Sequence, residues 1–292
     1  MKITPVQSLW LALLITAGSP VAGKFTVGYM SPSFILLAGT FINLLLYIPW
    51  LTRNNLWHRL IDKDIRHSLS VMGLCGTALP FMLLLLALKW TTPSNSAILN
   101  QAESVYSLLF AYLFLGEKPS LKQVFGTVMI AAGAVLILAV NGYSPMWKGD
   151  ILVLGTVWMF QVSHIAAKKL PQDLSVDFIT AARGFYGFLW SIILALAALP
   201  LGMDIGCKAD LKAWLALFYI AVFVYTVRNK FWYHSIRNMP LAKATAVILS
   251  YPVFTYILSV LIGFDSISIY QTAGLVLALG GAYIVTFAKK AQ

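Results

Sequence analysis

Long apolar stretches alternate along the chain with short segments rich in proline, glycine and charged residues. A helix needs roughly 20 apolar residues to cross the hydrocarbon core of a bilayer. Measured against that length, the sequence predicts ten membrane-spanning helices, numbered in chain order: approximately Pro5 to Gly23, Pro32 to Trp50, Ser68 to Leu88, Pro93 to Leu115, Leu121 to Val140, Asp150 to Ala167, Val176 to Leu199, Ala213 to Tyr233, Leu241 to Ile262 and Ile269 to Ala288. The pattern therefore predicts an all-α integral membrane protein.

Composition and charge favour the same fold class. Of the 292 residues, 60% are hydrophobic and 11% are charged, whereas soluble domains contain about 25% charged residues. The net charge of +11 is better explained by positive residues in cytoplasmic loops than by a nucleic-acid partner. No nucleic-acid partner is therefore expected. With a cytoplasmic N-terminus, fourteen Lys and Arg residues fall in inner segments and five in outer ones, which predicts that both termini are cytoplasmic.

The second half of the chain repeats the first. Residues 111–136 match residues 259–284 at a shift of 148, and the earlier parts of the halves match at a shift of 144. At the first shift the matched pairs are Gln123 with Gln271, Gly126 with Gly274, and Gly133 with Gly281. We therefore predict two repeats, residues 1–145 and 146–292. Each holds five spans, and this odd number orients the two repeats oppositely in the membrane. Inverted repeats around a central cavity are typical of carriers that work by alternating access.

Four stretches of the chain carry a family resemblance. They are ALKWTTPSNSAIL at Ala87–Leu99, AYLFLGEKPSLKQVFG at Ala111–Gly126, SIRNMPLAKATAVILSYPVF at Ser235–Phe254, and Gln271–Gly281. They resemble the EamA-type branch of the drug/metabolite transporter superfamily, and the resemblance covers essentially the whole chain. It implies a ten-span carrier with a central cavity that exports amino acids or other small metabolites across the bacterial cytoplasmic (inner) membrane.

The chain departs from the family pattern at one helix-distorting proline. Pro252 stands thirteen residues before Asp265, as the family commonly has it, but Ser104 holds that place before Glu117. A broken helix is therefore expected in span nine and not in span four. Glu117 and Asp265 themselves stand just before the next helix, where an acidic residue caps free amides and offsets the helix dipole.

Glu103 is the sharpest candidate for a functional residue. It lies near the middle of span four, where an acidic side chain costs roughly 3 kcal/mol unless it faces protein or water. Asn100, Glu103, Ser104 and Ser107 recur at three- and four-residue spacing and form a polar stripe on one helix face. We interpret the stripe as the lining of a substrate cavity, with Glu103 binding an amine or a coupling proton. The structural alternative is a neutral, hydrogen-bonded acid that holds span four against a neighbour.

Two basic side chains lie inside other spans. Arg183 of span seven could pair with a substrate carboxylate or with Glu103, or extend to the nearer interface. His164 of span six is either a proton relay or a packing residue. Glu103 and Arg183 together would suit a zwitterion. No carboxylate or second histidine stands at metal-ligand spacing from His164, so no metal is expected.

Aromatic and basic residues extend the candidate site. Tyr251 of span nine aligns with Glu103 at the shift of 148, which brings both toward one central site. Tyr106 and Trp158 are candidate wall residues or ordinary core. Arg228 and its neighbours on span eight could attract anions to an inward entrance, but we favour positive-inside anchoring for them. The glycines of spans five and ten predict that these two helices pack closely. The same surface could also serve as the contact between two copies of the chain in a dimer.

Three function classes compete. The sequence contains no Gly-x-Ser-x-Gly, His-Glu-x-x-His or P-loop motif, which argues against an enzyme and against ATP as the energy source, and no cofactor is expected. A non-transporting membrane module is a weaker hypothesis than a carrier. We predict a monomeric or homodimeric secondary transporter for an amino acid or a similar zwitterion or amine. A proton-coupled multidrug or nucleobase exporter is the alternative.

Overall fold

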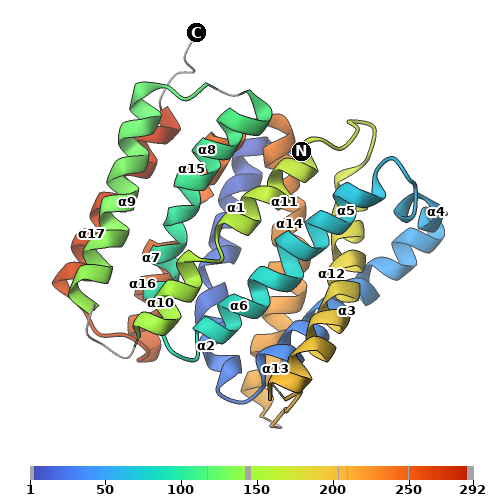
Figure 1. The fold of residues 1–292 in the computed structure, drawn as a ribbon, viewed down its shortest axis with the longest axis horizontal. Coiled ribbons are helices and arrows are strands. Elements are labelled where there is room, and N and C mark those ends of the chain that lie inside the picture. The colour runs from blue at the N-terminus through green and yellow to red at the C-terminus, as the bar shows by residue number, and fades with distance from the viewer. Residues whose placement is uncertain are drawn as a thin grey trace.

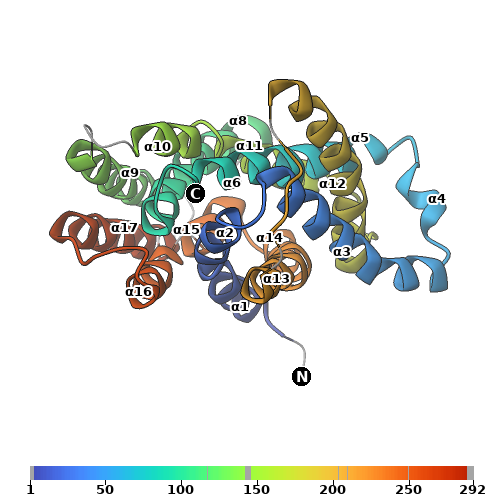
Figure 2. The same cartoon turned by 90° about the horizontal axis from the view of Figure 1, so that it is seen from below.

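The structure is a computed structural model that describes residues 3–116, 118–141, 146–202, 204–208, 210–248 and 250–287. Within these residues the fold is a bundle of helices without a named strand (Figures 1 and 2). An isolated antiparallel bridge joins Met30 to Cys207 and ties the α2–α3 connection to the loop before α13. The all-helical prediction is confirmed for this part of the chain.

The first half begins its helices where the sequence supplies caps. Thr4, Ser31 and Thr92 each accept a hydrogen bond from a backbone N–H one turn on, and a proline follows each of them at the first helical position. The elements are α1 Pro5–Ala17, α2 Ser19–Val27, α3 Pro32–Arg53, α4 Trp57–Leu60, α5 Arg66–Gly73, a π-helix Leu74–Ala78, α6 Leu79–Ala87, α7 Pro93–Leu99, a 3₁₀ turn Asn100–Ala102, α8 Glu103–Leu115 and α9 Leu121–Asn141.

The second half has the same kinds of element. Ser175 and Asp210 cap α12 and α13 with their side-chain oxygens. The elements are α10 Trp147–Leu154, α11 Trp158–Lys168, α12 Val176–Ala198, a 3₁₀ turn Leu199–Leu201, α13 Leu211–Phe218, a π-helix Tyr219–Val227, α14 Arg228–Asn238, α15 Leu241–Ile248, α16 Pro252–Ile262 and α17 Ile269–Phe287.

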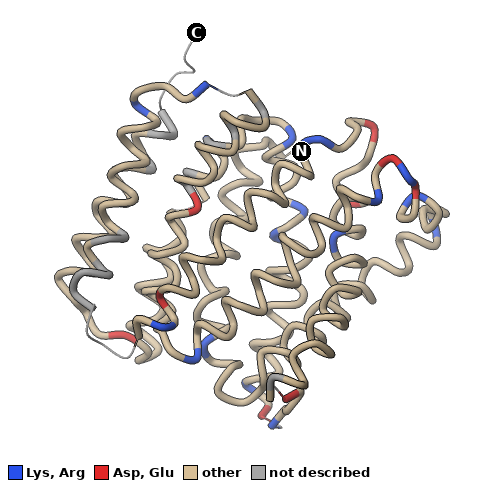
Figure 3. The backbone as a smooth tube through the Cα atoms, in the orientation of Figure 1, with Lys and Arg blue, Asp and Glu red and all other residues tan. Residues whose placement is uncertain are grey.

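Six continuous helical stretches are long and apolar enough to cross a membrane. They are Pro5–Val27, Pro32–Arg53, Arg66–Ala87, Trp147–Lys168, Val176–Ala198 and Leu211–Asn238, and they correspond to six of the predicted spans. Shorter apolar helices lie at Leu121–Gly133, Pro252–Ile262 and Ile269–Gly281. Along the backbone, most Lys, Arg, Asp and Glu residues lie near the two ends of the bundle, and a few lie along its middle (Figure 3). The chain is therefore a multi-pass membrane protein.

Span four is broken, which corrects the sequence-based expectation. The 3₁₀ turn at Asn100–Ala102 separates α7 from α8, although no proline is present there. Span nine is broken just before Pro252, as predicted, between α15 and α16. The two broken spans cross: α7 packs against α16, and α8 packs against α15. The break in span four therefore coincides with a tertiary crossing that its own sequence does not signal.

Asp265 caps a helix of the other half. Its Oδ2 atom accepts hydrogen bonds from Ser259 Oγ at 2.5 Å and from the backbone N–H of Ser94 at 3.3 Å, in the first turn of α7. Gln271 Nε2 contacts Asp265 Oδ1 at 3.4 Å and Asn95 Oδ1 at 3.1 Å. The residue thus fixes the start of α7 rather than that of α17. Glu117 lies outside the described residues.

The α9 and α17 helices lie side by side at one edge of the bundle, as both views show (Figures 1 and 2). Their glycines meet backbone to backbone: a Cβ atom on Gly133 would lie 2.5 Å from the carbonyl oxygen of Gly274, and one on Gly281 would lie 2.3 Å from that of Gly126. The close approach that these glycines predict is present in the structure.

Candidate functional site

A cavity lies where the broken spans four and nine meet α1, α2, α6, α11 and the span from α13 to α14. The empty space between its lining residues, open mouth included, is about 830 Å³. Most of its wall area is apolar, and the polar residues that line it include Asn100, Glu103, His164, Arg228 and Tyr251. The cavity continues toward the end of the bundle where α2 and α6 stop, past Gly23 and Leu88.

Glu103 begins α8 and faces this cavity. The residue is only 8% exposed. Its Oε1 atom accepts a hydrogen bond from Gln161 Nε2 at 2.6 Å and lies 3.6 Å from His164 Nδ1. Among the described residues, no hydrogen bond or ion pair reaches its Oε2 atom. One carboxyl oxygen is thus held by the protein, and the other remains available at the cavity wall.

Asn100 and Tyr251 join the two broken spans at the cavity. Asn100 Nδ2 donates a hydrogen bond to the Tyr251 hydroxyl at 3.0 Å. The Asn100 Oδ1 atom is buried and has no hydrogen-bond partner among the described residues. Tyr251 therefore lies beside the stripe that carries Glu103, in the place where the internal alignment puts it.

His164 also lines the cavity, one turn after Gln161. It is 2% exposed, its Nδ1 atom lies 3.4 Å from Gln161 Nε2, and its ring centroid is 4.8 Å from that of Trp232. The imidazole is therefore packed on an aromatic wall and adjoins the Glu103–Gln161 pair. Both sequence-based interpretations of His164, as a relay and as a packing residue, fit this position.

Arg228 lines the cavity, and this corrects our preference for interface anchoring. The span that carries it runs from Leu211 to Asn238, so the residue stands well inside the membrane segment. Its Nε atom donates to Thr16 Oγ1 at 3.2 Å, and its Nη1 atom donates to Asn229 Oδ1 at 3.0 Å. The guanidinium carbon lies 5.8 Å from the Trp232 ring centroid. The contacts thus hold the side chain at the wall of the cavity.

Arg183 is buried in a separate polar network, away from the cavity wall. It is 1% exposed. Its Nε atom donates to Thr77 Oγ1 at 2.8 Å, its Nη1 atom donates to the Tyr233 hydroxyl at 2.8 Å, and its Nη2 atom donates to the carbonyl of Gly76. Because all three nitrogens are held by protein, the guanidinium neither extends to an interface nor pairs with Glu103. The carbonyl of Gly76 lies in the π-helix of span three, which the sequence pattern did not predict.

The remaining candidates lie elsewhere. Ser107 is buried one turn beyond Glu103, and its hydroxyl has no partner among the described residues. Tyr106 packs against Phe110 with 6.2 Å between ring centroids. Trp158 is 38% exposed and donates a hydrogen bond to the carbonyl of Gly155 at 2.9 Å. Neither of these aromatic residues lines the cavity. The side chain of Ser104 lies outside the described part of the structure.

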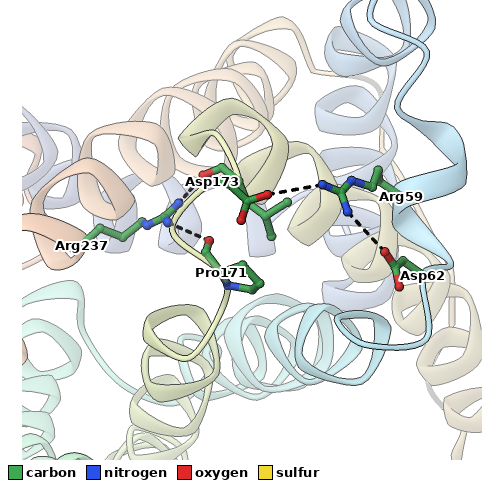
Figure 4. Close-up of polar contacts among 6 residues, drawn as sticks. Arg59, Asp62, Pro171, Asp173 and Arg237 are labelled. Carbon is green, nitrogen blue, oxygen red and sulfur yellow. Dashed lines mark hydrogen bonds and ion pairs between the residues drawn. The ribbon is translucent and has the colours of Figure 1, made fainter.

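The opposite end of the bundle is closed. A hydrophobic cluster there includes Leu60, Ile65, Leu170 and Leu174 from the two connections on that side. Figure 4 shows polar contacts between the connections at this end. Arg59 contacts Asp62 and Asp173, each at 3.4 Å, and Arg237 donates to the carbonyls of Pro171, at 2.9 Å, and Leu174. Contacts from span eight and from the span two–three connection thus hold the α11–α12 loop over the closed end.

Comparison with known proteins identifies the family. The model of the EamA-like transporter family matches residues 6–139 and 147–287. The chain belongs to the EamA-like transporter family. An uncharacterized transporter of Archaeoglobus fulgidus is 26% identical over 95% of this chain and 96% of its own length. The uncharacterized transporter YyaM of Bacillus subtilis is 22% identical over 96% of this chain and 93% of its own length.

Two further likenesses bear on function and fold. A probable terminal-alkyne amino-acid exporter of Streptantibioticus cattleyicolor is 22% identical over 66% of this chain and 64% of its own length. A solved crystal structure superposes on this EamA-like chain with a TM-score of 0.74, at 17% identity, and covers 97% of this chain and 96% of the other. At that identity the superposition shows a shared fold.

The sequence pointed to the side of the cavity formed by spans four and nine but not to the side formed by span eight. The repeat and the polar stripe pointed to Asn100, Glu103 and Tyr251, which meet there. Arg228 was undervalued because span eight was predicted to start at Ala213 and end at Tyr233. The helical stretch of this EamA-like transporter extends to Asn238, ten residues beyond Arg228. The run of polar residues after Tyr233 concealed this extension.

Proposed function

We propose that this EamA-like chain is a secondary transporter that moves a small organic metabolite, an amino acid or a similar zwitterion or amine, by alternating access. The observation that carries the proposal is the carboxylate of Glu103 on the wall of a largely apolar cavity, at the crossing of two broken spans. Broken helices at the membrane midplane are where carriers of this kind bind substrate. Export from the cytoplasm is the proposed direction.

Reciprocal packing supports the proposed arrangement of ten spans in two inverted repeats. α7 packs on α16 as α15 packs on α8, and α1 packs on α14 as α10 packs on α6. The glycine contacts follow the same rule. Gly126 meets Gly281, and their repeat equivalents Gly274 and Gly133 meet each other. A two-fold axis between the halves explains each pair of contacts with one operation.

The cavity and the closed end support a proposed outward-facing state, with both termini in the cytoplasm. On this proposal the native Cys207, an exposed free cysteine on the loop before α13, reacts in intact cells with a membrane-impermeant thiol reagent. A cysteine at Ser19, on the cavity wall, reacts from the same side once Cys75 and Cys207 are replaced. Labelling of Cys207 only after the membrane is opened would reverse the proposed orientation.

Removal of the Arg237 contacts is expected to shift this equilibrium. Arg237→Ala releases the α11–α12 loop from span eight and so weakens the closed end. The protein then spends less time in the outward-facing state, and labelling of Ser19→Cys from outside falls by about two- to threefold. Arg53→Ala removes an exposed positive charge from the end of α3, on the same side of the bundle, and serves as the matched control. Equal labelling in the two variants would argue against Arg237 as part of a gate.

Counterflow in liposomes tests the function itself. Purified protein is reconstituted with an unlabelled solute inside, and labelled solute is added outside. Apolar amino acids, basic amines, nucleobases and organic cations form the panel. We expect accumulation of an amino acid or amine at least fivefold above protein-free liposomes. Accumulation confined to nucleobases or to lipophilic cations would favour the multidrug or nucleobase alternative. No accumulation of any solute would support a non-transporting module.

A further inference from the structure

Arg228 is a cation without an anionic partner at the cavity wall. In the part of the chain that the structure describes, no ion pair within 4.0 Å includes it. Its two hydrogen bonds go to the neutral oxygens of Thr16 and Asn229, and none leaves Nη2. Buried cations in proteins are normally paired with an anion, because an unpaired charge in a medium of low polarity is costly. The side chain thus has a bidentate donor without its usual acceptor.

The cavity keeps Glu103 and Arg228 apart. Both line it, yet their charged groups do not form an ion pair. Each is held from the side by neutral groups: Gln161 for the carboxylate, and Thr16 and Asn229 for the guanidinium. Opposite charges that share a small cavity without closing on each other leave room for a ligand that contacts both. A zwitterion has the charges to do so.

The rest of the wall limits the kind of side chain that fits. Much of the remaining lining is apolar and comes from Phe81, Leu84, Leu85, Leu88, Ile220 and Val224. The hydroxyls of Ser19, Ser96 and Tyr225 also lie on the wall, but none of these residues carries a charge. A third ionised group on the ligand would therefore be desolvated without a partner of opposite charge.

We propose that Arg228 is the residue that binds the substrate carboxylate, and that the substrate is an α-amino acid with an apolar side chain. The ammonium group lies at Glu103 and the free Oδ1 atom of Asn100, and the carboxylate is held by the two-pronged guanidinium. This inference rests on the proposed transport function. It replaces Arg183, whose donors are all satisfied by protein, as the carboxylate partner.

Competition counterflow with matched analogues tests the assignment. The labelled reporters are leucine and phenylalanine. The competitors are each amino acid, the amine that lacks only its carboxylate (3-methylbutan-1-amine or 2-phenylethylamine) and the keto acid that lacks only its ammonium group. For the wild-type protein we expect each amino acid to compete at a concentration at least tenfold lower than either analogue. Amines that compete as well as the amino acids would overturn the assignment.

Variants then locate the carboxylate contact. Arg228→Gln is expected to reduce the advantage of the amino acid over its amine to less than threefold, and to leave its advantage over the keto acid largely in place. Arg228→Lys restores part of the first advantage, because it keeps the charge but loses the fork. Lys212→Gln removes an exposed positive charge from the same span, and both advantages are expected to persist. An Arg228→Gln protein that still prefers amino acids tenfold contradicts the proposal.

The outcomes separate this inference from the transport function. If basic amines are transported and amino acids are not, the carboxylate assignment fails and the transport function stands. If the wild-type protein moves no solute of the panel, the function itself fails. Each variant is compared at equal folded amount, measured by gel filtration and melting temperature. Should Arg228→Gln not fold, the comparison of amino acid, amine and keto acid on the wild-type protein still decides the substrate class.

Discussion

Glu103→Gln is expected to reduce transport at least tenfold and to leave the fold intact. A hydrogen bond to a charged group contributes about 1.5–3 kcal/mol, and each 1.4 kcal/mol changes an equilibrium about tenfold. A glutamine cannot offer a negative charge to a substrate ammonium group or accept a coupling proton. We therefore expect the loss in both cases, whichever of the two roles the carboxylate has.

This substitution separates function from structure because of the contact that Glu103 already makes. Gln161 Nε2 donates to Glu103 Oε1 at 2.6 Å. A glutamine at position 103 keeps a carbonyl oxygen that accepts the same hydrogen bond, with nearly the same side-chain volume. If Glu103 only holds span four against α11, the variant should transport normally. If the carboxylate serves the substrate, transport falls and the melting temperature changes little.

Asp150→Asn is the matched control. Asp150 is a second buried acid, 1% exposed, whose Oδ1 atom accepts a hydrogen bond from Thr91 Oγ1 at 2.5 Å, and it does not line the cavity. The control makes the same chemical change in a membrane-spanning segment away from the cavity. We expect counterflow within about twofold of wild type at equal folded amount. Equal counterflow by Glu103→Gln and the wild-type protein would remove Glu103 from the site.

The two arginines show why the cavity was only partly predictable from sequence. Both interrupt apolar spans, and a hydropathy pattern does not tell which one faces free space. Arg183 looked like the better ligand because it lies deeper in its predicted span, but Thr77, Gly76 and Tyr233 satisfy its donors. Arg228 follows a π-helix that runs from Tyr219 to Val227. Such wide turns change which face a later residue presents, and apolar sequence does not encode them visibly.

The break in span four has a similar explanation. Breaks in membrane helices are commonly associated with proline. Ser104 stands at the position where the family commonly has a proline, so the sequence argued against a break in span four. The 3₁₀ turn at Asn100–Ala102 instead stands where α7 and α8 pack on different halves of span nine. The contact between Asn100 and Tyr251 could be anticipated, because the repeat alignment compares the two spans directly. The break itself depends on tertiary packing, and no single stretch of sequence contained it.

Gly281→Ala is expected to destabilise the protein strongly, with a loss of about 1–3 kcal/mol and a clearly lower yield of folded protein. An added Cβ atom would lie 2.3 Å from the carbonyl oxygen of Gly126 and 2.8 Å from Ile130 Cγ1. The first of these atoms is backbone, so the overlap is relieved only if α17 and α9 move apart. Membrane helices associate through close packing of small residues, and that separation removes contacts along the whole interface.

The neighbouring glycine supplies the control for this interface. Among the described residues, a Cβ atom on Gly280 would meet only the Cε atom of Met129, at 3.2 Å, and that flexible side chain can move aside. We therefore expect Gly280→Ala to melt within about 2 °C of wild type, and Gly281→Ala and its repeat equivalent Gly133→Ala to melt well below it. Melting temperature in detergent and gel-filtration profiles measure the difference.

Since Gly133 and Gly281 exchange places under the proposed two-fold axis, losses of similar size are expected for Gly133→Ala and Gly281→Ala. A large loss at only one of them would mean that the two ends of the α9–α17 contact are not equivalent.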